Sequence, residues 1–341
     1  MADTHILGSN ALDPQIFVDF LSSAKIDSQP KHIRLLKGGA NNQVYRIDLQ
    51  EGDPVILKSY FQHPQDARPR LKAEFEFLTF GWNQGIRCIP QPIFQDPVQN
   101  LALYTYVEGS LASPIHADES FVHSAASFLF ALNQKKKSGQ HLLDASEACL
   151  QTMDFIHTVE KKLSNLLNIT DMNPLLSAFL YQELLPYWAE VKEKTCKAAL
   201  HHLDPSSEDL FLTPSDFGLH NALITSSKQP CFIDFEYAGW DDPAKTICDF
   251  FLQPKIPIPY AYFDAFAQQV ASLSANREKT FERTTQMFPV CHVKWCCIIL
   301  NVFLKTGKSR REFANSDQIA FQENQIELAR KHLSKFSSLR P

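Results

Sequence analysis

The stretch from Leu212 to Glu236, LTPSDFGLHNALITSSKQPCFIDFE, carries most of the information about the fold of this chain. It contains two short apolar runs next to polar residues, which is typical of two strands joined by a turn. Asp216 and Asn221 stand five residues apart on the loop before the first run, and Asp234 follows the second run. Because an unpaired carboxylate at the end of an apolar strand is costly, Asp234 is expected to bind a metal ion or a cation.

Each of these polar residues also has an ordinary structural interpretation. An Asx-turn would explain the spacing of Asp216 and Asn221, and a solvated turn would explain the acidic loop after Asp234. The order of several signals along the chain favours a functional site more than any one of them does. Two further signals lie upstream of this stretch.

The first upstream signal is the segment Gly38–Asn42, GGANN, between strands expected at 33–36 and 44–49. The chain has 11 glycines, where average usage of about 7% would give roughly 24, so a glycine pair is informative. A hairpin tip without side chains can place backbone N–H groups against phosphates. A purely structural hairpin is the alternative.

The second upstream signal is a lysine at the end of an apolar strand, Val55–Lys58. Glu74 lies sixteen residues further on, in a segment with helical periodicity over 71–82. A strand lysine held by a helix carboxylate can orient an ammonium toward nucleotide phosphates. Glu76 is the rival partner, and Glu74 is preferred because Leu78 lies on its turn of the helix. The alternative is that Lys58 only extends to solvent from the end of the strand.

The pattern of apolar residues divides the chain into two regions. Residues 31–110 indicate strands with one helix, whereas the segments 120–137, 146–167 and 175–202 have helical periodicity. Strand-like residues return at 210–236, and helical patterns follow from Pro243 onward. We therefore predict an α+β fold. Its domains are an N-terminal lobe at 1–107, with 1–30 as an extension, and a helical C-terminal lobe at 108–341.

Composition excludes several classes of protein. The chain has 341 residues and a net charge of −5, which argues against a nucleic-acid coat that needs many cations. Its eight cysteines include no C-x-x-C pair, so we expect reduced, mostly buried thiols. The apolar stretch Trp295–Leu304 is too short to span a bilayer and is expected to lie in the core. Without a signal-peptide pattern at the start, we expect a soluble, cytoplasmic protein.

Taken together, the motifs resemble those of the aminoglycoside phosphotransferase/choline kinase family, small-molecule relatives of the protein-kinase fold, over roughly residues 30–255. The matching segments are GANNQVY at 39–45, Lys58 with Glu74, IPQP at 89–92, YTYVEG at 104–109, Asp216 with Asn221, and Asp234 with Gly239, Asp242 and Asp249. The resemblance implies a two-lobe fold, with a small antiparallel sheet and one main helix in the N-terminal lobe and a mainly helical C-terminal lobe.

The resemblance also implies a reaction and the residues that perform it. It implies an ATP-dependent phosphotransferase, with ATP or GTP as donor, Mg²⁺ as cofactor and a hydroxyl of a small molecule as acceptor. Asp216 would be the catalytic residue, and Asn221 and Asp234 would hold the metal. The residues implied at the nucleotide are Gly38, Gly39, Asn41, Asn42, Lys58, Glu74, Thr105 and Val107. A non-catalytic nucleotide-binding protein on the same fold is the alternative.

Two departures from the family pattern lie in the catalytic loop. Pro214-Ser215 stands where the family usually has His-Gly, and His220 stands where a small residue is usual. A proline fixes φ there without touching the chemistry. His220 could reach the acceptor or a phosphate, or it could pack beside the loop.

The acceptor is the least determined part of the prediction. Residues 276–341 carry 12 Lys+Arg and 6 Asp+Glu, a net charge of +6, so the first 275 residues have a net charge of −11. A basic tail argues against a polycationic, aminoglycoside-like acceptor and favours a sugar or sugar conjugate, unless the tail faces solvent. An amino alcohol such as choline would need an aromatic cage, for which Tyr237 and Trp240 are candidates. His220 and Glu236 complete the set of possible acceptor-binding residues.

Overall fold

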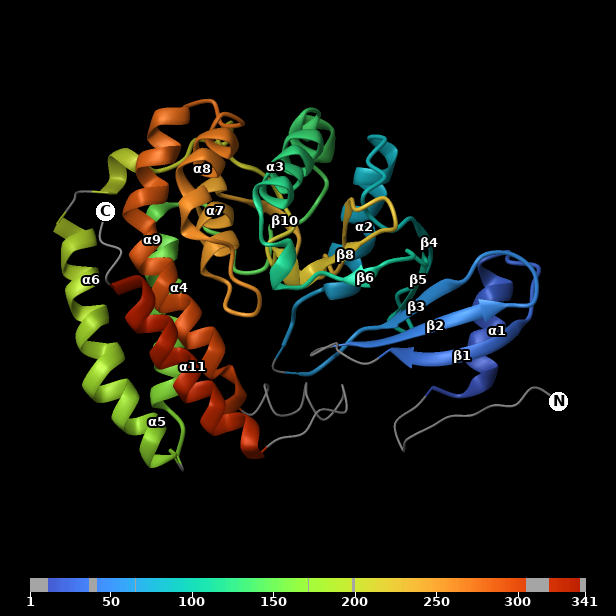
Figure 1. Ribbon diagram of the computed structural model, residues 1–341, viewed down its shortest axis with the longest axis horizontal. Helices are drawn as coiled ribbons and strands as arrows, with labels where there is room; N and C mark the ends of the chain where they lie inside the picture. Colours follow the sequence, from blue (N-terminus) through green and yellow to red (C-terminus); the bar gives the residue numbers. More distant parts are fainter. Residues whose placement is uncertain are drawn as a thin grey trace.

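The computed structural model describes residues 12–36, 42–64, 66–170, 172–197, 200–304 and 319–337. It has a small sheet-containing part at one end and a larger helical part at the other (Figure 1). The predicted order of a β-rich region followed by a helical region is confirmed. The domain boundary at residues 107 and 108 stays a prediction; it falls between strand β5, which ends at Thr105, and strand β6, which begins at Ser110.

The N-terminal part is built on a five-stranded antiparallel sheet with the order β1-β2-β3-β5-β4. The strands are β1 Pro30–Leu36, β2 Gln43–Leu49, β3 Val55–Ser59, β4 Pro92–Asp96 and β5 Leu101–Thr105. Successive side chains on a strand point to opposite faces. Leu57 and Leu103 therefore share one face, while Ile56 and Tyr104 lie on the other.

Each face of this sheet is covered by a helix. Helix α2, Arg70–Asn83, packs on the face of Ile56 and Tyr104. Helix α1, Pro14–Ser23, packs on the opposite face, where Phe17 contacts Tyr45 edge-on at 5.1 Å between ring centroids. The sequence suggested only an extension at 1–30, and the structure shows that part of it belongs to the core of the sheet.

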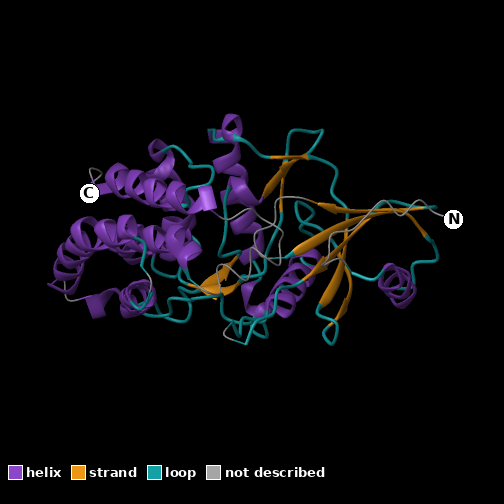
Figure 2. Cartoon of the chain, turned by 90° about the horizontal axis from the view of Figure 1, so that it is seen from below, coloured by secondary structure: helices purple, strands orange, loops and turns teal. Residues whose placement is uncertain are grey.

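The C-terminal part is mainly helical, with a few short strands on the side nearer the five-stranded sheet (Figure 2). The helices are α3 Glu119–Asn133, α4 Thr152–Leu167, α5 Pro174–Phe179, a π turn Leu180–Leu184, α6 Leu185–Lys197, α7 Pro243–Leu252, α8 Phe263–Ala271, α9 Arg277–Ile299 and α11 Ile319–Ser337. The strands are β6 Ser110–Leu111, β7 Phe211–Thr213, β8 Ala222–Ile224, β9 Pro230–Phe232 and β10 Gly239–Asp241. Short 3₁₀ turns lie at 114–116, 136–139, 200–203, 219–221, 260–262 and 300–303.

Capping explains where the helices depart from the sequence prediction. Helix α4 begins at Thr152 and not at 146, because Asp154 accepts hydrogen bonds from the backbone N–H groups just before the helix. Helix α9 begins at Arg277, where the side chain of Asn276 caps the first turn by accepting a hydrogen bond from the amide of Lys279.

Helix α9 is the central helix of the C-terminal part and contacts α4, α7, α8 and α11. Among the described residues, the helical stretch Arg277–Phe303 alone has the length and apolar composition of a membrane span, and most of its apolar window is buried within the protein. The prediction that Trp295 and its neighbours form part of the core is confirmed by their burial.

All eight cysteines are free thiols, and all but Cys88 and Cys196 are buried, as predicted.

Candidate active site

Lys58 lies at the centre of the candidate site, on the sheet face that α2 covers. Its Nζ is 2.6 Å from Glu74 Oε2 on α2 and 2.6 Å from Asp234 Oδ1 on the loop after β9. Glu76, the rival in the sequence, instead pairs with Lys72 on the exposed side of α2. The alternation of β3 points Lys58 toward α2, and Glu74 lies with Leu78 on the buried face of that helix, which is the reason the sequence favoured it.

Glu74 is held by more than the lysine. Its Oε2 also accepts a hydrogen bond from Tyr60 Oη at 2.8 Å, and its Oε1 accepts one from the backbone N–H of Phe235 at 3.2 Å. Burial opposes the charge on Lys58, but the carboxylates of Asp234, Glu74 and Glu236 outweigh it and raise the pKa of the ammonium well above its ordinary value. Lys58 is therefore a fixed positive charge.

Asp234 follows strand β9 in a left-handed backbone conformation, with φ of 68°. Only a few per cent of non-glycine residues adopt positive φ, and such strain concentrates at functional sites. The side chain of Asp234 is 38% exposed, whereas Lys58 and Glu74 are almost fully buried. Asp234 is thus the solvent-accessible residue of the cluster formed by Lys58, Glu74 and Asp234.

Asp216 lies on the loop after β7, where a second left-handed residue, Ser215 with φ of 66°, turns the chain. The Nδ2 of Asn221 donates a hydrogen bond to the backbone oxygen of Asp216 at 2.9 Å. The backbone oxygen of Asn221 in turn accepts from Ile233 N at 2.9 Å. This last bond joins the Asp216 loop to the Asp234 loop, so the structure brings together the three residues that the sequence placed in one site.

His220 makes a contact that sequence reasoning missed. Its Nε2 lies 2.9 Å from Asp216 Oδ1, and its buried Nδ1 has no hydrogen-bond partner among the residues that the structure describes. Burial alone would raise the pKa of Asp216, but the charge and hydrogen bond of His220 and a hydrogen bond from Asn221 lower it below its ordinary value. Gly218 leaves room for this contact, since a Cβ there would sit 3.1 Å from His220 Nδ1.

Glu236 is buried, and its carboxylate joins the two parts of the protein. Its Oε2 accepts a hydrogen bond from Asn42 Nδ2 at 2.6 Å and lies 3.4 Å from Arg70 Nε. Asn42 also accepts from the backbone N–H of Phe61 at 3.1 Å. To bind an acceptor, Glu236 would first have to break these contacts.

The two aromatic candidates are also engaged within the protein. The ring of Tyr237 is covered by the guanidinium groups of Arg68, at 5.0 Å, and Arg70, at 5.8 Å from its centroid. Trp240 lies on β10 and donates its indole N–H to the backbone oxygen of Gly139 at 3.0 Å.

The segment expected to contact adenine leaves the sheet at the end of β5. Thr105 pairs with Val55 of β3, and its Oγ1 accepts a hydrogen bond from Gln91 N at 2.9 Å. Val107 follows as a half-buried residue. Gly38, Gly39 and Asn41 lie outside the described residues.

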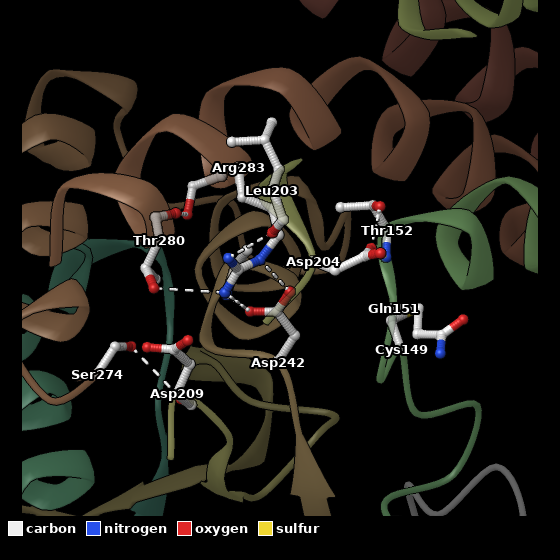
Figure 3. A network of polar contacts seen from close by, with 12 residues as sticks. Cys149, Gln151, Thr152, Leu203, Asp204, Asp209, Asp242, Ser274, Thr280 and Arg283 are labelled. Atoms are coloured by element: carbon white, nitrogen blue, oxygen red, sulfur yellow. Dashed lines mark hydrogen bonds and ion pairs between the residues drawn. The ribbon is translucent and has the colours of Figure 1, made fainter. Parts of the chain in front are cut away.

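Buried ion pairs hold the acidic loop that follows Asp234. Asp242 accepts two hydrogen bonds from Arg283, which also donates to the backbone oxygen of Leu203 (Figure 3). In the same region Asp241 pairs with Lys245, and both oxygens of Asp249 pair with Lys294. The carboxylates that the resemblance matched at Asp242 and Asp249 therefore have partners from the protein itself.

Comparison with protein families agrees with this arrangement. Residues 32–251 match the model of the phosphotransferase enzyme family, APH. This match covers about two thirds of the chain and includes Lys58, Glu74, Asp216, Asn221 and Asp234. No curated protein matches the chain in a sequence search.

Solved structures of small-molecule kinases share the fold. Spectinomycin phosphotransferase in complex with ADP and spectinomycin has a TM-score of 0.62 at 13% identity, covering 93% of this chain and 98% of its own. Choline kinase LicA from Streptococcus pneumoniae has a TM-score of 0.61 at 15% identity, covering 94% and 98%. Choline kinase from Cryptosporidium parvum has a TM-score of 0.57 at 12% identity, covering 96% and 97%.

Proposed function

This chain belongs to the phosphotransferase enzyme family, and on that premise we propose that it transfers the γ-phosphate of ATP to a hydroxyl group of a small molecule. One observation carries the proposal: Lys58 Nζ lies 2.6 Å from both Glu74 and Asp234, which come from a helix of the N-terminal part and a loop of the C-terminal part. The fixed ammonium of Lys58 can bind the phosphates of a nucleotide, and the partly exposed carboxylate of Asp234 can bind a cation that accompanies those phosphates.

The residues of the site suit a hard divalent cation such as Mg²⁺. Asp234 offers a partly exposed carboxylate, and Asn221 offers its amide oxygen because its nitrogen donates to the Asp216 backbone. Oxygen ligands of this kind are those that Mg²⁺ prefers. When bound there, Mg²⁺ would offset negative charge on the phosphates of the nucleotide.

Asp216 is the group we assign to the acceptor hydroxyl. Its side chain is 35% exposed, and His220 occupies its Oδ1, so Oδ2 is the oxygen left to accept the hydroxyl proton. The lowered pKa of Asp216 keeps the carboxylate ionised at neutral pH. A base held in one orientation contributes through positioning as well as through proton transfer.

The charges around the site favour a neutral or anionic acceptor, such as a sugar or a sugar conjugate. Acidic residues are expected where a polycation binds, but Asp241, Asp242 and Asp249 are neutralised by buried cations. Four basic residues of the tail, Lys305, Lys308, Arg310 and Arg311, lie outside the described residues, so whether they face the acceptor or solvent stays untested.

A choline-like acceptor is less well supported. Choline carries a quaternary ammonium group, which is recognised by the open faces of aromatic rings. In this chain the face of Tyr237 is covered by Arg68 and Arg70, which would repel such a cation. The fold is shared with choline kinases and with a spectinomycin phosphotransferase, so the choice of acceptor rests on these local residues.

A panel of hydroxyl compounds tests the proposal. The wild-type protein is incubated with Mg-ATP and sugars, sugar acids, amino alcohols or aminoglycosides, and ADP release and product mass are measured. We expect acceptor-dependent ADP release with a phosphorylated product. Stabilisation by Mg-ATP in a thermal melt without turnover on any acceptor would favour a nucleotide-binding protein without catalysis.

A further inference from the structure

Helices α9 and α11 lie side by side in the helical part, away from the five-stranded sheet (Figure 1). Three side chains with metal-binding chemistry meet between them. His292 and Cys296 come from α9 and His332 comes from α11. One potential ligand atom from each lies within 4.8 Å of the other two.

The spacing of His292 and Cys296 on α9 allows both side chains to bind one metal ion. Residues four apart on a helix project from the same face, which is the spacing of the two histidines in the H-E-x-x-H metal motif. His292 and Cys296 have this spacing, and His332 faces them from the neighbouring helix. The ring centroids of the two histidines are 5.0 Å apart.

The hydrogen bonds of His292 fix which of its nitrogens could bind a cation. Its Nε2 lies 3.0 Å from the backbone oxygen of His332, and since a carbonyl oxygen only accepts, Nε2 carries the proton. The lone pair is therefore on Nδ1, where it accepts a hydrogen bond from Tyr187 Oη at 3.3 Å that a bound cation would replace. Metal-binding histidines commonly donate their other N–H to a backbone carbonyl in this way.

His332 supplies a second, independent observation. Its side chain is buried, with the residue 6% exposed, and its Nε2 has no hydrogen-bond partner among the described residues. An unpaired polar atom in the interior destabilises the folded protein. A cation bound between the helices would satisfy this nitrogen.

We propose that His292, Cys296 and His332 form a binding site for a borderline-soft divalent cation of the Zn²⁺ type, separate from the phosphotransfer site. One thiolate and two imidazoles are ligands that zinc favours, with a fourth position left for a water molecule. Binding exchanges the Cys296 thiol proton for a sulfur–metal bond, and that proton leaves to solvent. The site would join α9 to α11 near the C-terminal end of the described chain.

Cobalt spectroscopy tests this site without reference to enzyme activity. Protein without a histidine tag is stripped of metal and titrated with Co²⁺, which reports a thiolate ligand by a charge-transfer absorption band. We expect this band at one equivalent, and competition by Zn²⁺. The Cys296→Ser variant should lose the band, and His332→Gln should weaken binding at least about tenfold.

Cys297→Ser is the matched control, because Cys297 is the next residue on α9 and is equally buried but lies outside the cluster. Its band should equal that of the wild-type protein. Absence of the band in the wild-type protein would overturn the proposal even if a variant failed to fold. Persistence of the band in Cys296→Ser, or its loss in Cys297→Ser, would overturn it as well.

Discussion

Lys58 Nζ lies 2.6 Å from Asp234 Oδ1, which joins a strand of the sheet to a loop 176 residues away. The same ammonium is held by Glu74, and Glu74 in turn accepts the backbone N–H of Phe235 beside Asp234. The lysine, the helix carboxylate and the loop therefore form one unit. A change in any member is expected to move the other two.

The pair formed by Lys58 and Glu74 gives the first prediction. Glu74→Gln should lower kcat/KM for ATP by about 10²-fold, because the ammonium loses its fixed position. Glu76→Gln is the matched control on the same helix, since within the described part of the chain Glu76 pairs with Lys72 and not with Lys58. Steady-state kinetics with varied ATP would measure both. Equal losses in the two variants would contradict the assignment of Glu74.

The contact of His220 with Asp216 predicts a change in the pH profile. His220 favours the charged form of the carboxylate, so His220→Ala should raise the pKa of Asp216. Less of the base is then ionised at low pH, and the acid limb of kcat/KM should move to higher pH. His220→Gln keeps a hydrogen-bond donor but not the charge, and should restore part of the rate. An acid limb unchanged in His220→Ala would rule out this role.

The buried pair of Arg283 and Asp242 predicts a large effect on stability. Arg283→Met leaves Asp242 as an unpaired charge in the interior, and should lower the free energy of unfolding by about 3–5 kcal/mol. Arg277→Met, on the exposed first turn of the same helix, should change it by less than about 0.5 kcal/mol. Urea unfolding of both variants makes the comparison. Similar stabilities would mean that Arg283 does not hold the acidic loop.

Gly239 gives a prediction about the loop after Asp234. A Cβ at this position would lie 2.3 Å from the backbone oxygen of Leu143, so Gly239→Ala forces two backbone segments apart. We expect a loss of about 3 kcal/mol or more in the free energy of unfolding. Gly52→Ala is the control, because Gly52 has a left-handed φ but open space around it, and should cost about 1–2 kcal/mol. A Gly239→Ala variant as stable as Gly52→Ala would contradict the close approach.

Some of the site could be predicted from sequence because its determinants are local. The alternation of β3 and the helical spacing of α2 suffice to point Lys58 toward Glu74. The turns at Asp216 and Asp234 were marked by apolar strands that end in polar residues. Positions of this kind depend on neighbours within a few residues, so a single sequence contains the information.

The remaining contacts depend on distant segments of the chain. Glu236 meets Asn42 across 194 residues, and Asp249 meets Lys294 across 45 residues, so neither pair has a local signal. For the second pair the sequence does indicate that a partner is needed, because Lys294 lies among apolar residues of α9 and a buried lysine requires an anionic partner. It does not indicate which carboxylate that partner is. For His220 the sequence showed an unusual residue, but the contact with Asp216 depends on the turn at Ser215.

The central claim is that Asp216 accepts the proton of an acceptor hydroxyl during phosphoryl transfer from ATP. The most direct measurement is acceptor-dependent ADP release by the wild-type protein and by Asp216→Asn, with Mg-ATP binding measured in parallel. We predict a phosphorylated product from the wild-type protein, and a kcat lower by about 10²–10⁴-fold in Asp216→Asn with ATP affinity retained. Turnover by Asp216→Asn close to that of the wild-type protein would contradict the account.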